Sequence, residues 1–248
     1  MLQGRTIVIT GAARGLGAEI AADCAAKGAR LVIGDIRDEQ GRDVVAALTA
    51  KGVAARYVHV DLASPDSIEA FAADVRREEG EVHGLVNNGA IATDVGGKPF
   101  EEIDIDLWDR VMRVNIRGTW LMTRAMSPLF SKAGGQIVNL ASDTALWGPP
   151  NLLAYVTSKG AVISMTRSLS RELGPRRIGV TAIAPGIMRN EATDYVPAAR
   201  HQQYEQGRSV PGPQFPQDIV ETISFLLTPA ALVMTGQVVP LNAGFVFT

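Results

Sequence analysis

The chain has 248 residues, of which 46% are hydrophobic, and carries a formal net charge of −2. A chain of this length and apolar content can bury one large core, so we expect a single domain over residues 1–248. The small net charge predicts no nucleic-acid partner, and no stretch approaches the ~18 apolar residues of a membrane span. A lone cysteine, Cys24, and the absence of a signal-peptide pattern favour a cytoplasmic protein.

Apolar runs alternate with helical patterns along the chain. Strands are predicted near residues 6–10, 30–34, 55–60, 83–87, 135–140, 178–183 and 237–241. Helices are predicted near residues 15–28, 38–51, 65–79, 105–131, 153–174 and 216–227. This alternation predicts an α/β fold in which helices cover both faces of a parallel sheet of seven strands. The one long irregular stretch, about 186–216, is typical of either a functional lid or a disordered segment.

A glycine-rich turn joins the first predicted strand to the first predicted helix, and its glycines are Gly11, Gly15 and Gly17. Glycines in such a turn let the backbone approach a diphosphate, which the N–H groups and dipole of the helix N-terminus favour. The second strand ends at Asp35, whose carboxylate is placed to accept hydrogen bonds from both hydroxyls of an adenosine ribose. The context predicts a dinucleotide site, although an isolated glycine-rich turn often has no ligand.

The charges at this site favour NAD(H) over NADP(H). The carboxylate of Asp35 would repel the 2′-phosphate of NADP and would lose its hydrogen bonds to the ribose diol. Arg14 in the glycine-rich turn and Arg37 just past Asp35 argue the other way, because either guanidinium could meet a phosphate. Since the acidic residue at the strand end normally dominates, we predict NAD(H) as the cofactor.

Tyr155 and Lys159 lie four residues apart in a predicted helix, which places them one above the other on the same face. A free tyrosine titrates near ~10, and a neighbouring cation lowers the pKa of its phenol toward useful acid–base chemistry. Any long amphipathic helix can carry such a pair. The glycine-rich turn and Ser142 upstream favour a catalytic role for this pair.

The spacing Gly-x-x-x-Gly-x-Gly, together with Ser142, Tyr155 and Lys159, resembles the short-chain dehydrogenase/reductase family over essentially the whole chain. Further matching motifs are Asp61-Leu62, Asn87-Asn88, Asn115 and Pro185-Gly186. The resemblance implies a Rossmann-like, doubly wound fold. It also implies hydride transfer between a nicotinamide and a small-molecule secondary alcohol or ketone, with residues 186–216 closing over the substrate as a lid.

The resemblance implies a role for each matching residue. Tyr155 would exchange a proton with the substrate oxygen, and Ser142 would hydrogen-bond that oxygen. Lys159 would hold the nicotinamide ribose and lower the pKa of Tyr155, while Asn115 would hold a water in the proton relay behind the lysine. The other expected cofactor contacts are Gly11, Arg14, Gly15, Leu16, Gly17, Asp35, Asp61, Leu62, Asn88, Pro185, Gly186 and Asn190.

Three positions depart from the family pattern. The usual Asn-Asn-Ala-Gly ends in Gly89 and Ala90 here, which puts the backbone geometry beside the cofactor in question. Asn190 replaces a common threonine, and its carboxamide can still hydrogen-bond the nicotinamide amide. Asp143 directly follows Ser142, where it would either face solvent or help to select the substrate.

An apolar segment lies between Ser142 and Tyr155, and the expected lid adds further apolar side chains. These residues are Ala145, Leu146, Trp147, Pro149, Pro150, Leu152 and Leu153, with Met188, Tyr195, Val196 and Tyr204 from the lid. Such a wall suits a cyclic or aromatic secondary alcohol or its ketone, with Trp147 beside the substrate. The same side chains could equally pack under the lid or in a subunit interface.

Other functions remain open at this stage. The main alternative is a 3-oxoacyl thioester (ACP) reductase, although such relatives usually use NADPH, which Asp35 disfavours. A non-redox member of the fold and a catalytically silent NAD-binding scaffold are more distant alternatives, because no catalytic position is substituted. The resemblance also implies a homotetramer built on the helices near 105–131 and 153–174, and we predict no metal site.

Overall fold

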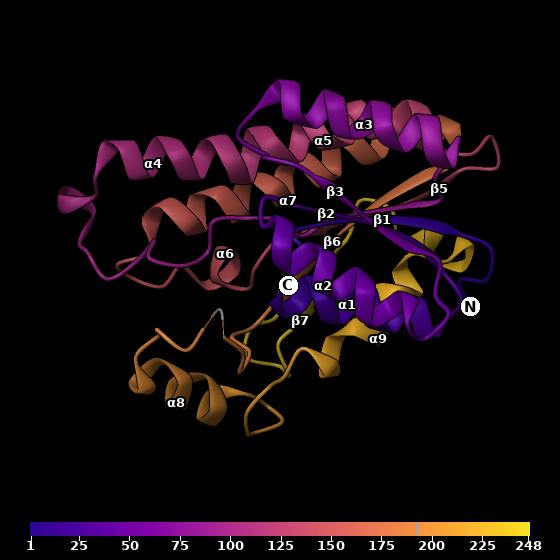
Figure 1. Ribbon diagram of the computed structural model, residues 1–248. Helices are drawn as coiled ribbons and strands as arrows, with labels where there is room; N and C mark the ends of the chain where they lie inside the picture. The colour runs from indigo at the N-terminus through magenta and orange to yellow at the C-terminus, as the bar shows by residue number, and fades with distance from the viewer. Residues whose placement is uncertain (192) are drawn as a thin grey trace.

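Across residues 1–191 and 193–248, which the computed structural model describes, seven parallel strands form one central sheet (Figure 1). They are β1 (Thr6–Thr10), β2 (Arg30–Asp35), β3 (Ala55–His59), β4 (Gly84–Asn87), β5 (Gly135–Leu140), β6 (Ile178–Pro185) and β7 (Val238–Leu241). Their order across the sheet is β3-β2-β1-β4-β5-β6-β7. The order reverses between β1 and β4, which confirms the predicted doubly wound, Rossmann-like fold.

Helices cover both faces of the sheet (Figure 1). One face carries α1 (Gly15–Ala26), α2 (Asp38–Thr49) and α9 (Gln217–Leu226). The other carries α3 (Pro65–Glu79), α4 (Ile105–Met112), α5 (Thr119–Met126) and α7 (Leu153–Leu173). Because both faces are covered, β1, β5 and β6 are buried along their whole length.

Each face of the sheet has its own apolar core. Ile20 of α1 and Ile223 of α9 pack in the first cluster, and Phe71 of α3 and Met122 of α5 pack in the second. All four side chains are almost completely buried. No helix in the described part of the chain is both long and apolar enough to cross a lipid bilayer.

The helix predicted over residues 105–131 is not continuous. A π-helical segment, Arg113–Gly118, separates α4 from α5, and a short 3₁₀ turn, Ser127–Leu129, follows α5. At Gly118 a β-carbon would lie 2.7 Å from the carbonyl oxygen of Leu62, so the helix approaches that loop closely. π-helical turns carry an extra residue and are frequent at functional sites.

In the part of the chain that the structure describes, two further α-helices lie where the sequence predicts none. The short α6 (Thr144–Trp147) follows β5, and α8 (Ala198–Gly207) lies within the stretch 186–216 that the sequence predicts to be irregular. Residue 192 of that stretch lies outside the described residues. Figure 1 shows α8 on the side of the molecule where the strands end. The correction for α8 has a simple cause: only His201 and Tyr204 of this helix are buried, so its apolar pattern is weak.

Candidate active site

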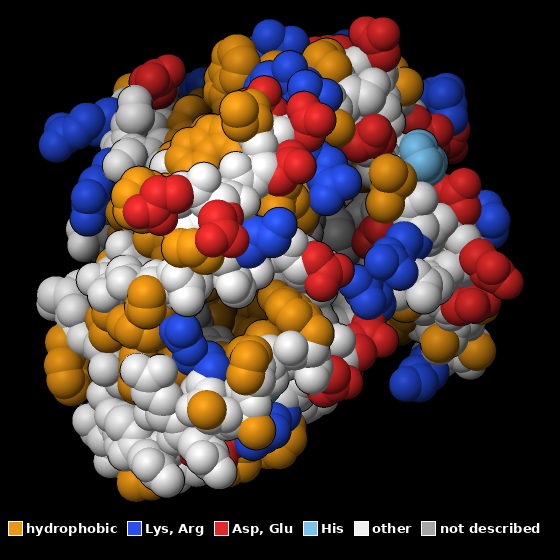
Figure 2. Space-filling view, turned by 90° about the vertical axis from the view of Figure 1, so that its left-hand side faces the viewer, with side chains coloured by type: hydrophobic (Ala, Val, Ile, Leu, Met, Phe, Trp, Pro, Cys, Tyr) orange, Lys and Arg blue, Asp and Glu red, His pale blue; other side chains and the backbone are white. Residues whose placement is uncertain are grey.

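A cleft of about 1150 Å³ opens at the carboxyl ends of the strands. Figure 2 shows this side of the molecule, with a hollow that has hydrophobic side chains inside it and basic side chains on its rim. In open α/β sheets this edge, at the point where the strand order reverses, is where ligands bind. Its lining includes Ser142, Tyr155, Lys159 and all twelve of the other expected cofactor residues, Gly11, Arg14, Gly15, Leu16, Gly17, Asp35, Asp61, Leu62, Asn88, Pro185, Gly186 and Asn190.

The three glycines of the first turn serve different purposes. At Gly11, which has φ +65°, a β-carbon would lie 2.5 Å from Cα of Gly89, and at Gly17 it would lie 2.2 Å from the carbonyl oxygen of Gly11. At Gly15, with φ +54°, a β-carbon would meet nothing within 4 Å. Gly11 and Gly17 therefore let the loops pack together, whereas Gly15 faces open space at the start of α1, where a cofactor diphosphate would fit.

Substitutions at Gly15 and Gly17 are expected to have different effects. Gly15→Ala should lower the free energy of unfolding by only about 1 kcal/mol, the strain of a left-handed backbone, yet weaken NADH binding by about tenfold or more. Gly17→Ala should cost about 3 kcal/mol or more, because its β-carbon meets backbone. Denaturant unfolding and NADH fluorescence titration measure the two effects. Equal losses of stability in the two variants would contradict this assignment.

The exchanged Gly89-Ala90 pair has a structural explanation. A β-carbon at Gly89 would lie 2.7 Å from Cδ1 of Leu62 and 3.2 Å from the amide nitrogen of Gly11. Glycine at this position therefore lets the loop after β4 pack directly on the glycine-rich turn. The side chain of Asn88 secures the same contact, because its Nδ2 donates a hydrogen bond to the carbonyl oxygen of Gly11 at 2.8 Å.

The carboxylate of Asp35 is buried at the far end of the cleft from Tyr155, only 9% exposed. Its Oδ2 accepts a hydrogen bond from the amide of Ala13 at 3.0 Å, and its Oδ1 accepts one from the amide of Arg37 at 3.0 Å. Each carboxylate oxygen has a second lone pair. The carboxylate is thus fixed in place and can still accept hydrogen bonds from a ribose diol.

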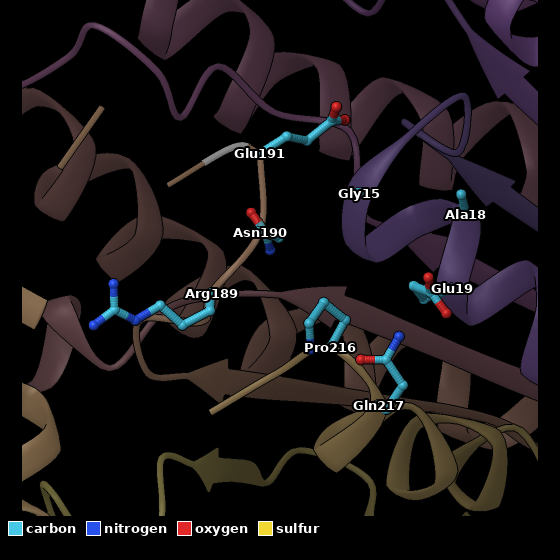
Figure 3. A pocket seen from close by; sticks show the side chains of 8 residues that line it. All are labelled: Gly15, Ala18, Glu19, Arg189, Asn190, Glu191, Pro216 and Gln217. Carbon is cyan, nitrogen blue, oxygen red and sulfur yellow. The ribbon is translucent and has the colours of Figure 1, made fainter. Parts of the chain in front are cut away.

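The two arginines that could meet a 2′-phosphate also line the cleft, but each has another partner. Nη1 of Arg14 lies 3.8 Å from Oε1 of Glu191, and Nη1 of Arg37 donates a hydrogen bond to Oε1 of Gln40 at 3.2 Å. Figure 3 shows the shallower hollow of about 310 Å³ between α1 and the loop that carries Glu191. The ion pair therefore bridges the glycine-rich turn and the start of the lid.

Ser142 follows the end of β5 and is 7% exposed. The hydroxyl of Thr144 donates a hydrogen bond to Oγ of Ser142 at 2.9 Å, and the amide of Thr144 lies 3.3 Å from the same oxygen. With its acceptor positions occupied in this way, the serine hydroxyl can direct its proton toward the cleft. This orientation suits hydrogen bonding to a carbonyl or alkoxide oxygen of a substrate.

The pKa of Tyr155 differs from the sequence-based expectation. Burial raises the pKa of this phenol, and a hydrogen bond with Ser142 is the influence that lowers it. Lys159 is not among these influences, and its expected effect on the pKa of Tyr155 stays a prediction. The lysine Nζ lies 5.6 Å from the centre of the tyrosine ring and donates a hydrogen bond to the carbonyl oxygen of Leu140 at 2.7 Å instead. Burial also lowers the pKa of Lys159, to about 8.

Asn115 does not line the cleft but lies behind it, 1% exposed, in the π-helical segment. Its Nδ2 donates hydrogen bonds to the carbonyl oxygen of Ile91 at 3.0 Å and to Oγ of Ser158 at 3.1 Å, and its Oδ1 accepts one from the amide of Ile91 at 2.8 Å. One side chain thus joins the loop after β4 to α7, the helix that carries Tyr155.

The apolar wall only partly matches the expectation. The expected residues that line the cleft are Pro150, Leu152, Met188, Tyr195, Val196 and Tyr204, whereas Ala145, Leu146, Trp147, Pro149 and Leu153 do not line it. The short helix α6 turns the indole of Trp147 toward the lid, where its Nε1 donates a hydrogen bond to the hydroxyl of Tyr204 at 3.0 Å. The residue expected beside the substrate therefore contacts the lid helix.

The sequence analysis did not identify two basic residues of the cleft, Arg110 of α4 and Arg200 of α8. Neither belongs to a recognisable motif, so no local pattern marks them. The guanidinium of Arg200 lies 5.4 Å from the centre of the Trp147 ring. No group of three His, Cys, Asp or Glu side chains in the described part of the chain could hold a metal ion.

Comparison with known proteins establishes the family. The model of a family described as enoyl-(acyl carrier protein) reductase matches residues 11–246. The 3-oxoacyl-[acyl-carrier-protein] reductase FabG of Aquifex aeolicus (strain VF5) is 31% identical over 247 residues, which cover 98% of each chain. The 3-alpha-(or 20-beta)-hydroxysteroid dehydrogenase of Mycobacterium tuberculosis (strain ATCC 25618 / H37Rv) is 38% identical over 197 residues, 79% of this chain and 74% of that protein.

The chain belongs to the short-chain dehydrogenase/reductase family and is an oxidoreductase that acts on CH–OH groups. A blue fluorescent protein from a metagenomic library, whose crystal structure contains NADPH, has a TM-score of 0.91 and is 28% identical over 99% of each chain. A short-chain type dehydrogenase/reductase from Mycobacterium marinum has a TM-score of 0.92 and covers 100% of this chain. At 24% identity it shows the likeness of fold alone.

Proposed function

We propose that this protein transfers a hydride between NAD(H) and a cyclic or aromatic secondary alcohol or its ketone. The main support for the proposal is that the expected catalytic and cofactor-binding residues line a single cleft. Ser142, Tyr155 and Lys159 line it together, and the buried carboxylate of Asp35 lines its other end. A dinucleotide that follows the glycine-rich turn between these two ends would bring its nicotinamide to the acid–base group.

Each catalytic side chain has a defined task in this reaction. Tyr155 gives its proton to the ketone oxygen in reduction and removes the alcohol proton in oxidation. Because burial raises the pKa of Tyr155, the phenol is protonated at neutral pH and can act as the acid for ketone reduction. Ser142 hydrogen-bonds the same oxygen, and Lys159 would bind the nicotinamide ribose. Bound NAD(H) supplies the hydride acceptor or donor.

The preference for NAD(H) is supported by charge. The 2′-phosphate of NADP(H) would approach the Asp35 carboxylate, which two backbone amides hold in place. Arg14 has Glu191 as an ion-pair partner at 3.8 Å, so a phosphate would compete with a carboxylate for this guanidinium. Like charges in a partly buried site repel strongly, and the phosphate would displace the hydrogen bonds of the ribose diol.

The apolar part of the cleft supports the proposed substrate class. Leu152, Met188 and Val196 line the cleft, and Met188 is 8% exposed. An apolar wall favours a cyclic or aromatic group through burial of its surface, worth roughly 25 cal/mol per Å². A small, highly hydroxylated sugar would leave its polar groups without partners along this wall.

A 3-oxoacyl thioester reductase that uses NADPH is a second candidate. Two observations favour it: the likeness to FabG over 98% of both chains, and the presence of Arg110 and Arg200 in the cleft. Guanidinium groups at the mouth could bind the phosphates of a thioester carrier. This candidate requires the cofactor site to tolerate a phosphate beside Asp35.

Paired assays separate the two candidates. One follows the absorbance of reduced nicotinamide with NAD and a panel of cyclic and aryl secondary alcohols, and the other uses NADPH with acetoacetyl-CoA. We expect turnover in the first assay to exceed that in the second by about 10² or more in kcat/KM. A reversed ratio would replace the proposed function with the thioester reductase.

We also propose that the protein is a cytoplasmic homotetramer. Exposed apolar side chains on α4, α5 and α7 support assembly, because Ile105 is 77% exposed, Trp120 46% and Leu153 44%. Apolar patches of this kind often mark protein–protein contacts. Light scattering coupled to gel filtration should give four times the mass of the chain, and a monomer would contradict the proposal.

A further inference from the structure

The carboxylate of Asp143, the residue after the catalytic serine, is completely buried. Its Oδ1 accepts a hydrogen bond from the hydroxyl of Tyr204 at 2.9 Å, and Nδ2 of Asn242 lies 3.5 Å from its Oδ2. The amide of Gly244 donates to Oδ1 of Asn242 at 3.1 Å, which fixes the orientation of that side chain. Asp143 thus lines the cleft without being exposed to solvent, and its carboxylate contacts the lid helix α8 and the C-terminal segment.

Tyr204 joins this carboxylate to an aromatic cluster. Its hydroxyl accepts a hydrogen bond from Nε1 of Trp147 at 3.0 Å, so its own proton is directed to Asp143. The ring of Tyr204 stacks on Phe245 with centres 4.1 Å apart and planes at 16°, and Trp147 meets the same phenylalanine edge-on at 5.5 Å. Helices α6 and α8 and the C-terminal segment therefore meet at one buried hydroxyl.

Asp143 also contacts the loop after β6, which lines the cleft. Its amide donates a hydrogen bond to the carbonyl oxygen of Pro185 at 3.0 Å, and a β-carbon at Gly186 would lie 3.2 Å from its Oδ2. Arg208, directly after α8, is 3% exposed and donates to the carbonyl oxygen of Ile187 at 2.6 Å. Asp143 thus contacts the end of β6 and the loop after it as well as α8 and the C-terminal segment.

We propose that Asp143 is a positioning residue that docks the lid helix α8 on the catalytic loop through Tyr204, and that its charge sets how firmly the lid is docked. The two contacts of the carboxylate hold α8 and the C-terminal segment next to Ser142, the group that binds the substrate oxygen. The catalytic consequence rests on the proposed function, whereas the docking of the lid does not.

The charge of this carboxylate changes near neutral pH. Burial raises the pKa of Asp143 to about 7, with Tyr204 of α8, Asn242 and Arg208 lowering it. The other ionisable group that it influences is Tyr155 of α7, and burial raises the pKa of both tyrosines, so they stay neutral in this range. Asp143 therefore changes its charge between acid and neutral pH, while the two tyrosines that it influences stay neutral.

The direction of the pH effect follows from linkage. An exposed aspartate titrates near ~4, whereas the docked one has a pKa of about 7, so the docked lid binds the proton more tightly than an undocked lid. Docking is therefore strongest at acid pH, weakens as the pH rises from about 4 to about 7, and changes no further above that.

Hydrogen exchange of the α8 amides in the full-length protein tests the proposal without any substrate. In the wild type, exchange corrected for intrinsic rates should be about tenfold faster at pH ~7.5 than at pH ~5.5. In Asp143→Asn, which keeps the shape of the side chain but cannot ionise, this pH dependence should disappear. His201 of α8 is unchanged in this variant, so a pH dependence that persists would come from a group other than Asp143 and would overturn the proposal.

A second variant tests the contact itself. Tyr204→Phe removes one hydroxyl and both of its hydrogen bonds, so exchange of α8 should rise about tenfold or more at all pH values, with the sheet unaffected. Ser209→Ala is the matched control, because it removes an exposed hydrogen bond from the same segment to the carbonyl oxygen of Gly244. Its exchange should match the wild type, and equal rates in the two variants would also overturn the proposal.

The pH profile and the KM of alcohol oxidation provide a further test, because a purely structural contact would change neither of them. The ionised Asp143 raises the pKa of Tyr155, so Asp143→Asn should shift the pH profile of alcohol oxidation toward lower pH. Tyr204→Phe keeps the charge and should instead raise the KM for the alcohol, with the Kd for NADH within about twofold of wild type. An absence of turnover in every variant would refute the proposed function and leave the exchange result standing.

Discussion

Tyr155→Phe is expected to lower kcat for alcohol oxidation by about 10³-fold, the typical worth of a well-placed general acid–base group. The substitution removes only the phenol hydroxyl, the proton-transfer group next to Ser142 in the cleft. The ring remains, so α7 should keep its packing. The Kd for NADH, from fluorescence titration, should therefore stay within about twofold of wild type while steady-state turnover collapses.

A second tyrosine of the cleft provides the control for this prediction. The hydroxyl of Tyr195 donates a hydrogen bond to the carbonyl oxygen of Ala92 at 2.6 Å, so it is already engaged with the backbone. Tyr195→Phe should lower kcat by less than about tenfold, the worth of one neutral hydrogen bond. If the two variants lost the same activity, or if Tyr155→Phe kept nearly all of it, Tyr155 would not be the acid–base group.

Asp35→Ala is expected to reduce the preference for NADH over NADPH by about 10²-fold in the ratio of dissociation constants. Hydrogen bonds to a charged group contribute about 1.5–3 kcal/mol, and the ribose diol would lose these bonds while the 2′-phosphate loses a repulsive partner. Titration of each reduced cofactor measures the ratio without a substrate. An unchanged ratio would show that another residue selects the cofactor.

Asp35→Ala is also expected to lower the stability of the protein, and the experiment needs a control for this loss. The Asp35 carboxylate also accepts hydrogen bonds from the amides of Ala13, which is buried, and Arg37, which is exposed, so Asp35→Ala leaves one buried donor unpaired. The loss at Ala13 costs about 1–3 kcal/mol of stability. Asp35→Asn keeps an acceptor oxygen and removes the charge. If charge selects the cofactor, the NADH to NADPH ratio should fall in both variants, with a smaller loss of thermal stability in Asp35→Asn.

The central strands could be predicted from the sequence because they are buried on both faces of the sheet. The expected ranges 6–10 and 135–140 coincide with β1 and β5, whose residues are buried without exception. Helix α8 could not be predicted, since it buries only two side chains. The π-helical segment was missed because it interrupts an otherwise regular helical pattern without a glycine or proline at its start.

Only part of the candidate site could be predicted from the sequence. The residues that line the cofactor side come from local motifs with fixed spacing, so the sequence could identify them. The lid contacts depend on segments far apart in the chain: Asp143 and Tyr204 are 61 residues apart, and Asp143 and Asn242 are 99 residues apart. The pKa of Tyr155 depends first on burial and then on its contact with Ser142, and both are properties of the folded chain.

The most direct test of the proposed function is an initial-rate measurement with NAD and a secondary alcohol such as 1-phenylethanol or cyclohexanol. Wild type and Tyr155→Phe should be assayed side by side through the absorbance of the NADH formed. We expect NADH formation by the wild type, its near-complete loss in the variant, and a much lower rate when NADP replaces NAD. Turnover that survives in Tyr155→Phe, or that is faster with NADP, would contradict an NAD-dependent dehydrogenase acting through this site.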